Sequence, residues 1–364
     1  MADFREEFQK LLESTYIPTV GDRAKIEKEL DKFLNSAFQN IPEKLYRYRQ
    51  CDEKGYSLDS FKDGTISLCR ANRFSDKYDS RVYVDKEKVI NEMTGGLKNA
   101  ISDLLKDIRL KNPMVKAESV TEICYDMECG LRDQEIIDKM IKEQHTDFIK
   151  EVETEMKSRE YRFRGNEKTA KIGCFTESVQ SKFMWDHYAG GYTGFALEYN
   201  LKEFIYKYQS KQDIFPYVFP VIYTDQMPDV TNDEANAYLR EKCLKEEWME
   251  SWAPLYYSVA LNALHMYIPY LYKDRAEYAY EREWRMICYD FENKEDFSLL
   301  PDLNCLKAIY YGPDISADNR EVLHKIAKDK GIAEYDISLD PDSRSYGLKV
   351  KLSNSAQVVP DTLV

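Results

Sequence analysis

Short strand-like segments separated by helical blocks of very unequal length constrain the fold of this chain most strongly. Strand patterns lie at 45–49, 65–69, 171–177, 194–199, 218–223, 280–288, 306–311, 333–337 and 346–352. The longest helical patterns between them cover residues 86–160 and 233–272. A doubly wound sheet needs regular strand–helix–strand units, which these blocks do not supply. The sequence therefore predicts an α+β fold with a core of mixed or antiparallel strands.

The order of the segments predicts one principal domain. Residues 1–42 contain two amphipathic helical patterns and are expected to pack as an N-terminal helical brace. Residues 43–352 are expected to form a single α+β domain with helical insertions near 86–165 and 230–275. Residues 353–364 are expected to form a C-terminal tail.

Charge and composition narrow the classes of function. The chain has 52 Lys and Arg residues against 65 Asp and Glu residues, a net charge of −13, which disfavours extended nucleic-acid binding. It contains no apolar run of about 18 residues, so no membrane association is expected. The first residues include no apolar signal region, which predicts a cytoplasmic protein.

The cysteines predict core thiols rather than a metal site. No Cys-x-x-Cys pair and no cysteine–histidine cluster occurs among the eight cysteines of the sequence. Cys69, Cys174 and Cys288 stand in apolar strand patterns, where a reduced cysteine behaves as a small apolar residue. We therefore predict no bound metal.

Two glutamates and an arginine occupy alternate positions in a late strand pattern. Because strand side chains alternate between faces, Glu281, Glu283 and Arg285 are expected to share one face. Carboxylates held that close raise the pKa of one of them and can act as an acid/base pair. The alternative is structural, with Arg285 neutralising Glu283 on an exposed sheet edge.

A pair of arginines marks the first strand pattern. Arg47 and Arg49 share one face, with Tyr46 and Tyr48 on the other. Two guanidinium groups can hold a phosphate or carboxylate by paired hydrogen bonds, which predicts a nucleotide or small-molecule ligand. The alternative is an internal ion pair with the late glutamates, and both interpretations can hold at once.

Three further residues are candidates with a structural alternative. His187 follows Trp185 in an aromatic segment and can donate a proton or hydrogen-bond a ribose, although a lone histidine is often structural. Asp76 and Asp79 can join the glutamates in binding a divalent cation. The Ser-Asp pair in that loop is also typical of a turn, so metal binding is the minor alternative.

Several of these motifs together resemble a known family. The set comprises Leu45-Tyr46-Arg47-Tyr48-Arg49, Phe74-Ser75-Asp76 through Asp79, Cys174-Phe175-Thr176-Glu177, Met184-Trp185, His187-Tyr188-Ala189, Gly194 through Glu198, Lys273, Glu281, Glu283, Trp284 and Arg285. From about residue 43 to 350 the chain resembles domain of unknown function two-nine-seven-one, a mainly bacterial family. Ser75, Lys77 and Tyr78 depart from that family's usual Phe-Asn-Asp-Pro-Phe-Asp loop. The family itself implies no activity.

The order of the parts is also similar to the ADP-ribosyltransferase superfamily. That resemblance implies an ADP-ribosyltransferase-like fold and NAD as co-substrate. Arg47 or Arg49 would hold NAD, Thr176 would stand where a serine or threonine is expected, and Glu283 would be catalytic. The sequence departs from the pattern because it has no Ser-Thr-Ser segment and two arginines compete for one role.

One cleft is expected to bring together Arg47, Arg49, Asp76, Trp185, His187, Glu281, Glu283 and Arg285. The expected catalytic residues are Glu283, Glu281 and His187, and the expected cofactor-binding residues are Arg47, Arg49, Thr176, Trp185, Tyr188 and Arg285. The first functional hypothesis is an NAD-dependent ADP-ribosyltransferase-like toxin or defence effector. The second is a non-catalytic module that senses a nucleotide or binds a protein, and the third is a metal-dependent nuclease built on Asp76, Asp79 and Glu283.

Overall fold

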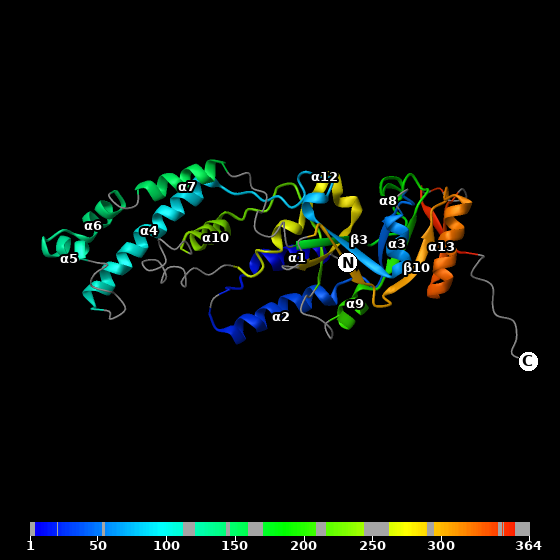
Figure 1. Cartoon of the computed structure of the whole chain (residues 1–364), viewed down its shortest axis with the longest axis horizontal. Coiled ribbons are helices and arrows are strands. Elements are labelled where there is room, and N and C mark those ends of the chain that lie inside the picture. The colour runs from blue at the N-terminus through cyan, green and yellow to red at the C-terminus, as the bar shows by residue number, and fades with distance from the viewer. Residues whose placement is uncertain are drawn as a thin grey trace, which may run out of the picture.

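The computed structural model combines one large sheet with helices at both of its ends and a projecting helical arm (Figure 1). It describes residues 4–19, 21–52, 55–111, 121–142, 146–158, 170–208, 216–243, 262–289, 295–340, 344 and 346–353. The predicted C-terminal tail therefore lies outside the described residues, except for Ser353. Parts of both predicted insertions, at 112–120, 143–145, 159–165 and 244–261, also lie outside them.

The described elements alternate between strands and helices without a regular rhythm. The strands are β1 (Leu45–Arg49), β2 (Thr65–Arg70), β3 (Ala170–Thr176), β4 (Phe195–Tyr199), β5 (Tyr217–Pro220), β6 (Ile222–Thr224), β7 (Tyr272–Asp274), β8 (Glu283–Tyr289), β9 (Phe297–Pro301), β10 (Leu306–Tyr311), β11 (Ala333–Leu339) and β12 (Leu348–Leu352). The α-helices are α1 (Phe4–Ser14), α2 (Arg23–Gln39), α3 (Tyr56–Asp63), α4 (Lys86–Arg109), α5 (Thr121–Glu128), α6 (Asp133–Met140), α7 (Thr146–Ser158), α8 (Lys182–Tyr188), α9 (Leu201–Tyr208), α10 (Thr231–Cys243), α12 (Arg275–Tyr278) and α13 (Ala317–Lys330). Short 3₁₀ turns η1 (Ala71–Arg73), η4 (Ile268–Tyr270) and η5 (Ala279–Glu281) join some of them.

The main sheet is mostly antiparallel. Its path runs β12-β11-β10-β4-β1-β3-β2-β9, and β8 pairs with both β3 and β5. β10 and β11 are parallel, as are β6 and β7, which form a separate two-stranded sheet. The predicted α+β class with a mixed or antiparallel core is therefore confirmed.

The sheet divides along one edge of β3. On that edge β1 pairs with β3 only where Tyr46 lies opposite Thr176, whereas β2 pairs further along, at Ile172. The other edge pairs with β8 from Ala170 to Thr176. Because β1 turns away from β3 after a single residue pair, side chains from β1, β2, β3 and β8 can face a common opening.

Helices α4 to α7 form an arm that extends away from the sheet at one end of the molecule (Figure 1). The arm has a small apolar core of its own, made of Ile101, Leu105, Ile123, Ile136 and Ile137. Helix α10 packs against α4. The described part of the region near 230–275 also contains strand β7, so this part is not wholly helical as predicted.

The first two helices pack on strand β5. Phe8 of α1 and Phe33 of α2 are buried and contact the ring of Phe219, with centroids 5.8 and 6.2 Å away. Asp22 caps α2 by accepting hydrogen bonds from the amides of Ala24 and Lys25. This packing holds α1 beside β8, where Arg5 reaches the site described below.

Two predicted element bounds are wrong. The segment 218–223 forms two strands, β5 and β6, which belong to different sheets and meet at Val221. The late strand begins at Glu283 rather than at 280, because Ala279–Glu281 is a 3₁₀ turn and Arg282 is left-handed with φ 45°. Helix α13 begins after Ser316, whose side chain caps it by accepting a hydrogen bond from the Asn319 amide. Strand β9 was not predicted.

Candidate functional site

A cavity of about 270 Å³ lies where β1 separates from β3. Residues from β1, β2, β3, β8, α8 and the loop after η1 line it. The lining residues are Tyr46, Arg47, Tyr48, Arg49, Cys69, Phe74, Ser75, Asp76, Asp79, Ile172, Cys174, Phe175, Thr176, Met184, Tyr188, Lys273, Tyr278, Glu281, Glu283 and Arg285. A concave site with a few convergent polar groups is the usual form of a small-molecule site.

Arg47 and Arg49 bring positive charge to the β1 wall of the cavity. Arg49 Nη2 donates to Ser67 Oγ at 3.1 Å, and the Arg47 guanidinium lies 5.5 Å from the Phe175 ring centre. Within the described part of the chain, neither arginine forms an ion pair with a carboxylate. Burial lowers the pKa of both, and the Arg47 charge adds to bring that of Arg49 to about 9. An anion between them would relieve this cost.

Arg285 has all of its donors occupied by protein groups. Its Nε donates to Glu283 Oε1 at 2.9 Å, and its Nη1 donates to Asp79 Oδ1 at 2.9 Å and to the Tyr270 carbonyl at 2.8 Å. Its Nη2 donates to Asp79 Oδ2 and to Glu283 Oε2. The five N–H groups of a guanidinium are thereby used. Arg285 lines the cavity, but its geometry indicates a positioning role instead of the expected cofactor contact.

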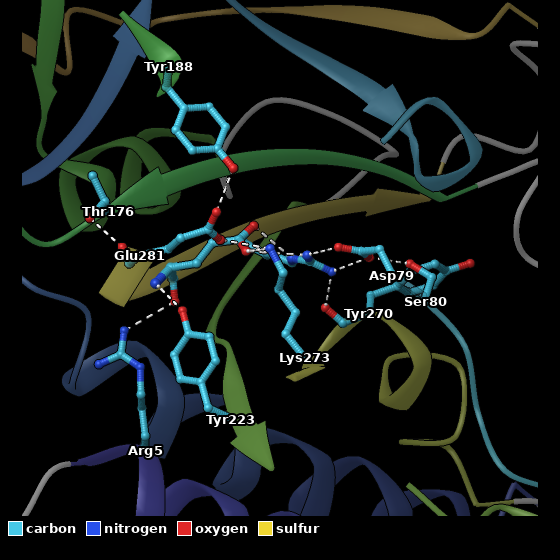
Figure 2. Close-up of polar contacts among 11 residues, drawn as sticks. Arg5, Asp79, Ser80, Thr176, Tyr188, Tyr223, Tyr270, Lys273 and Glu281 are labelled. Atoms are coloured by element: carbon cyan, nitrogen blue, oxygen red, sulfur yellow. Dashed lines mark hydrogen bonds and ion pairs between the residues drawn. The ribbon is translucent and has the colours of Figure 1, made fainter. Parts of the chain in front are cut away.

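Lys273 joins the two glutamates of the site. Its Nζ lies 2.7 Å from Glu281 Oε2 and 3.2 Å from Glu283 Oε2, and all three side chains are nearly buried. Tyr188 Oη donates to Glu281 Oε1 at 2.5 Å. Figure 2 shows Tyr188 and Lys273 approaching Glu281 from opposite sides. Glu281 therefore keeps acceptor capacity beyond these two donors.

The two glutamates have pKa values shifted in opposite directions. Burial raises the pKa of Glu281, and the Glu283 charge adds to that rise against the attraction of Lys273. Burial also opposes ionisation of Glu283, but the charges of Arg285 and Lys273 outweigh it and lower the pKa of Glu283 to about 2. Paired carboxylates with separated pKa values are typical of acid/base sites. One member stays ionised while the other can exchange a proton.

A tight turn carries Glu281 to the cavity, even though this residue is not on the strand. Thr176 Oγ1 donates to the Glu281 carbonyl at 2.6 Å. The Glu283 amide donates to Tyr223 Oη at 2.7 Å, and Arg5 Nη2 donates to the Glu283 carbonyl at 3.2 Å. Figure 2 shows Arg5 and Tyr223 reaching the backbone from the side opposite Tyr188. These bonds fix the backbone on both sides of left-handed Arg282.

Glu177 fastens the same turn through its side chain. It accepts from Arg5 Nη1 at 2.5 Å, from Arg282 Nε at 2.7 Å and from Trp284 Nε1 at 2.7 Å. Its carboxylate thus links helix α1 to the start of β8. Burial alone would raise the pKa of Glu177, but Arg5 and the other donors lower it.

Glu177→Gln is expected to destabilise the fold by about 2 kcal/mol, because hydrogen bonds to a charged group contribute about 1.5–3 kcal/mol. Urea denaturation measures the change. Glu27→Gln is the matched control, since Glu27 is exposed and pairs with Arg23 on the surface of α2. Equal denaturation midpoints for the two variants would contradict the role given to Glu177.

The structure brings most of the predicted residues together but leaves two outside. Arg47, Arg49, Asp76, Thr176, Tyr188, Glu281, Glu283 and Arg285 line the cavity. Trp185 is buried elsewhere, donating to the Val179 carbonyl at 2.7 Å. His187 is half-exposed and stacks on Phe183 with ring centres 3.7 Å apart. Met184 and Tyr188 are four residues apart and therefore share the face of α8 that lines the cavity. Trp185 and His187 do not line the cavity, contrary to expectation.

Few sequence patterns pointed to the remaining residues of the site. Lys273 belongs to the motif set that carries the family resemblance, although no role was predicted for it. No sequence pattern pointed to Arg5 or Tyr223. Among the described residues no group of three or more metal-ligating side chains occurs. Asp79 and Glu283 both bind Arg285, so a guanidinium occupies the place that the nuclease hypothesis gives to a cation.

Comparison with known proteins gives one match. Residues 184–286 match the family model for a protein of unknown function, DUF2971. The matched span includes Tyr188, Lys273, Glu281 and Glu283 but not β1. This supports the predicted resemblance to that family of unknown function. No curated protein and no solved structure matches the chain. In the described parts of the chain no helix is both long and apolar enough to span a membrane.

Proposed function

We propose that the cavity binds a phosphorylated nucleotide and cleaves its N-glycosidic bond, as an NAD-dependent ADP-ribosyltransferase-like enzyme would. One observation carries this proposal. Arg47 and Arg49, which lack carboxylate partners among the described residues, line the same cavity as two glutamates with oppositely shifted pKa values. Such a cavity offers an anion-binding wall and an acid/base wall to one ligand.

The arginines would hold the phosphate of the ligand. A guanidinium forms paired hydrogen bonds with phosphate oxygens, which a lysine ammonium does not. Because the two arginines repel each other, a bound phosphate stabilises both. Their contribution is equal in the ground state and the transition state, so it belongs to substrate binding.

The glutamates would act on the ribose. As the bond from the ribose C1′ to the base nitrogen breaks, its electron pair leaves with the base and the ribose gains positive charge. The ionised Glu283, held by Arg285 and Lys273, stabilises that charge without having to reorient. Glu281, whose pKa is raised, accepts the proton of the water or acceptor group that attacks C1′.

The mostly antiparallel sheet that divides around the cavity is compatible with an ADP-ribosyltransferase-like fold. A role as a toxin or defence effector additionally requires a macromolecular acceptor. Incubation of the chain with labelled NAD and a cell lysate, followed by detection of labelled protein and nucleic acid, tests for that acceptor.

Release of nicotinamide from NAD is the direct test of the activity. Arg47→Ala and Arg49→Ala are each expected to raise KM about tenfold or more with a smaller change in kcat, because a lost charged hydrogen bond costs about 1.5–3 kcal/mol. Arg23→Ala, on the exposed face of α2, is the control and should match the wild type. Absence of nicotinamide release by the wild type at any NAD concentration would contradict the catalytic proposal.

A non-catalytic module that senses a nucleotide is the second candidate. It is favoured by the saturation of the Glu283 carboxylate, which already accepts from Arg285 and Lys273 and interacts with the Cys174 thiol. A sensing module would be stabilised against heat by NAD yet release no nicotinamide. A protein that both binds NAD and releases nicotinamide would exclude this alternative.

A further inference from the structure

We infer that the cavity takes a single phosphate group, so that the unit it recognises is a ribose 5-phosphate with its attached base rather than a whole dinucleotide. The glycosidic part of this inference rests on the proposed function. The phosphate part stands on the charges of the cavity alone.

The cavity wall has four cationic side chains among the described residues, and two of them are already neutralised. Lys273 forms ion pairs with Glu281 and Glu283, and Arg285 forms ion pairs with Asp79 and Glu283. Neither has charge to offer a second phosphate. Arg47 and Arg49 remain for an anionic ligand.

The spacing of the two arginines suits one phosphate. They stand two residues apart on the same face of β1, roughly 7 Å along the strand, because a strand rises about 3.3 Å per residue. Guanidinium groups at that separation can flank a single phosphate and donate to different oxygens of it. Within the described residues, the N–H group of theirs that is engaged is the Arg49 donor, which bonds to Ser67 Oγ. The two side chains therefore form one anion subsite.

The opposite wall disfavours a second phosphate. Asp76, Asp79, Glu281 and Glu283 contribute carboxyl groups there. These four carboxyl groups face only two cations on that part of the lining, Lys273 and Arg285, so no excess positive charge is left there to attract a second phosphate. The ribose and its neutral or cationic base suit that region.

The size of the cavity agrees with this division. Its volume of about 270 Å³ falls just below the range of ~300–1,000 Å³ that is typical of sites enclosing a drug-sized ligand. A cavity of this volume suits a mononucleotide unit better than a whole dinucleotide. The adenosine half of NAD would lie outside the cavity and contribute little to recognition.

Titration calorimetry at constant ionic strength tests the inference. The ligands are ribose, ribose 5-phosphate, nicotinamide mononucleotide and NAD. We expect nicotinamide mononucleotide to bind within about threefold of NAD, ribose 5-phosphate to bind measurably, and ribose not to bind. NAD binding more than about 30-fold tighter than the mononucleotide would overturn the inference, since a second phosphate or the adenosine would then be recognised.

Nicotinamide release, measured on the same samples, separates this inference from the proposed function. Mononucleotide binding without nicotinamide release from either substrate would reject the proposed chemistry and leave the single-phosphate subsite standing. Release from NAD without binding of the mononucleotide or ribose 5-phosphate would keep the chemistry and reject the subsite. No binding of any ligand would reject both.

Two variants show whether β1 holds that phosphate. Arg47→Lys and Arg49→Lys keep the charge and remove the paired geometry, so each is expected to weaken ribose 5-phosphate and mononucleotide binding by about the same factor, tenfold or more. Circular dichroism confirms that both variants fold. Arg23→Ala serves as the control. Unchanged ribose 5-phosphate affinity in both lysine variants would overturn the assignment of the phosphate to these arginines.

Discussion

Arg285→Met is expected to destabilise the folded chain by about 3–5 kcal/mol. The substitution leaves the carboxylates of Asp79 and Glu283 without their guanidinium partner in a site where the arginine is 1% exposed. Removing one member of a buried ion pair costs far more than the pair contributes, because the remaining charge stays buried and uncompensated. Urea denaturation at neutral pH measures the loss.

An exposed pair of the same chemistry provides the control. Arg109 at the end of α4 pairs with Asp133 through two hydrogen bonds, and both side chains are about half exposed to solvent. Arg109→Met should therefore leave the denaturation midpoint almost unchanged. If Arg285→Met were as mild as Arg109→Met, the carboxylate network around the cavity would not hold the site as described.

Glu283→Gln is expected to reduce nicotinamide release by at least about 100-fold, the usual effect of removing one preorganised electrostatic group. It should also change the response of stability to acid. The pKa of Glu283 lies at about 2 in the folded chain, below its ordinary value of 4.5. Its contribution is present above about 4.5 and is lost as pH falls through about 2, because the unfolded chain takes up the proton first.

The direction of the pKa shift gives the acid effect a definite sign. A shift of this extent corresponds to about 3 kcal/mol at neutral pH. Between pH 4.5 and pH 2 the free energy of unfolding of the wild type should therefore fall more steeply than that of Glu283→Gln. Chemical denaturation at a series of pH values compares the two slopes. Parallel slopes would show that Glu283 is not held ionised by its neighbours.

Glu281→Gln is the matched comparison for that variant. Because the pKa of Glu281 is raised in the folded chain, its contribution to stability is present below 4.5 and is lost as pH rises through the folded value. The variant should lose nicotinamide release, since the proton acceptor is gone, while keeping the steep acid slope of the wild type. Loss of that slope in Glu281→Gln would reverse the roles assigned to the two glutamates.

The alternation of residues in the sequence was enough to predict which side chains of β1 share a face. Alternation placed Arg47 and Arg49 on one face of β1 and Tyr46 and Tyr48 on the other. In the structure the tyrosines are buried in a cluster with Trp185, and the arginines are half-buried. Period-two geometry is local, so a five-residue pattern determines which side chains share a face.

The position of Glu281 beside Glu283 was predicted, but for a partly wrong reason. Strand alternation was expected to put Glu281 beside Glu283, but a 3₁₀ turn and left-handed Arg282 bring it there instead. The donors that stabilise the turn, Arg5 and Thr176, are far away in sequence. The periodicity of a sequence segment does not depend on partners that are distant in the chain, so the turn could not be predicted from it.

Two strands escaped prediction because their patterns are weak. β7 has three residues and contributes Lys273 to the site. β9 buries Ser298 and Leu300 and exposes Phe297 and Leu299, so its apolar residues do not follow one face. Alternation predicts a strand only where polar and apolar residues separate between faces.

The affinity of the chain for NAD is the most direct test of the central claim that Arg47 and Arg49 make the cavity a phosphate-binding site. Titration calorimetry would compare the wild type with the Arg47→Ala, Arg49→Ala double variant. The arginine pair predicts measurable binding by the wild type and a loss of about 100-fold or more in the double variant. Equal affinities, or no binding of NAD by the wild type at millimolar concentration, would contradict the claim.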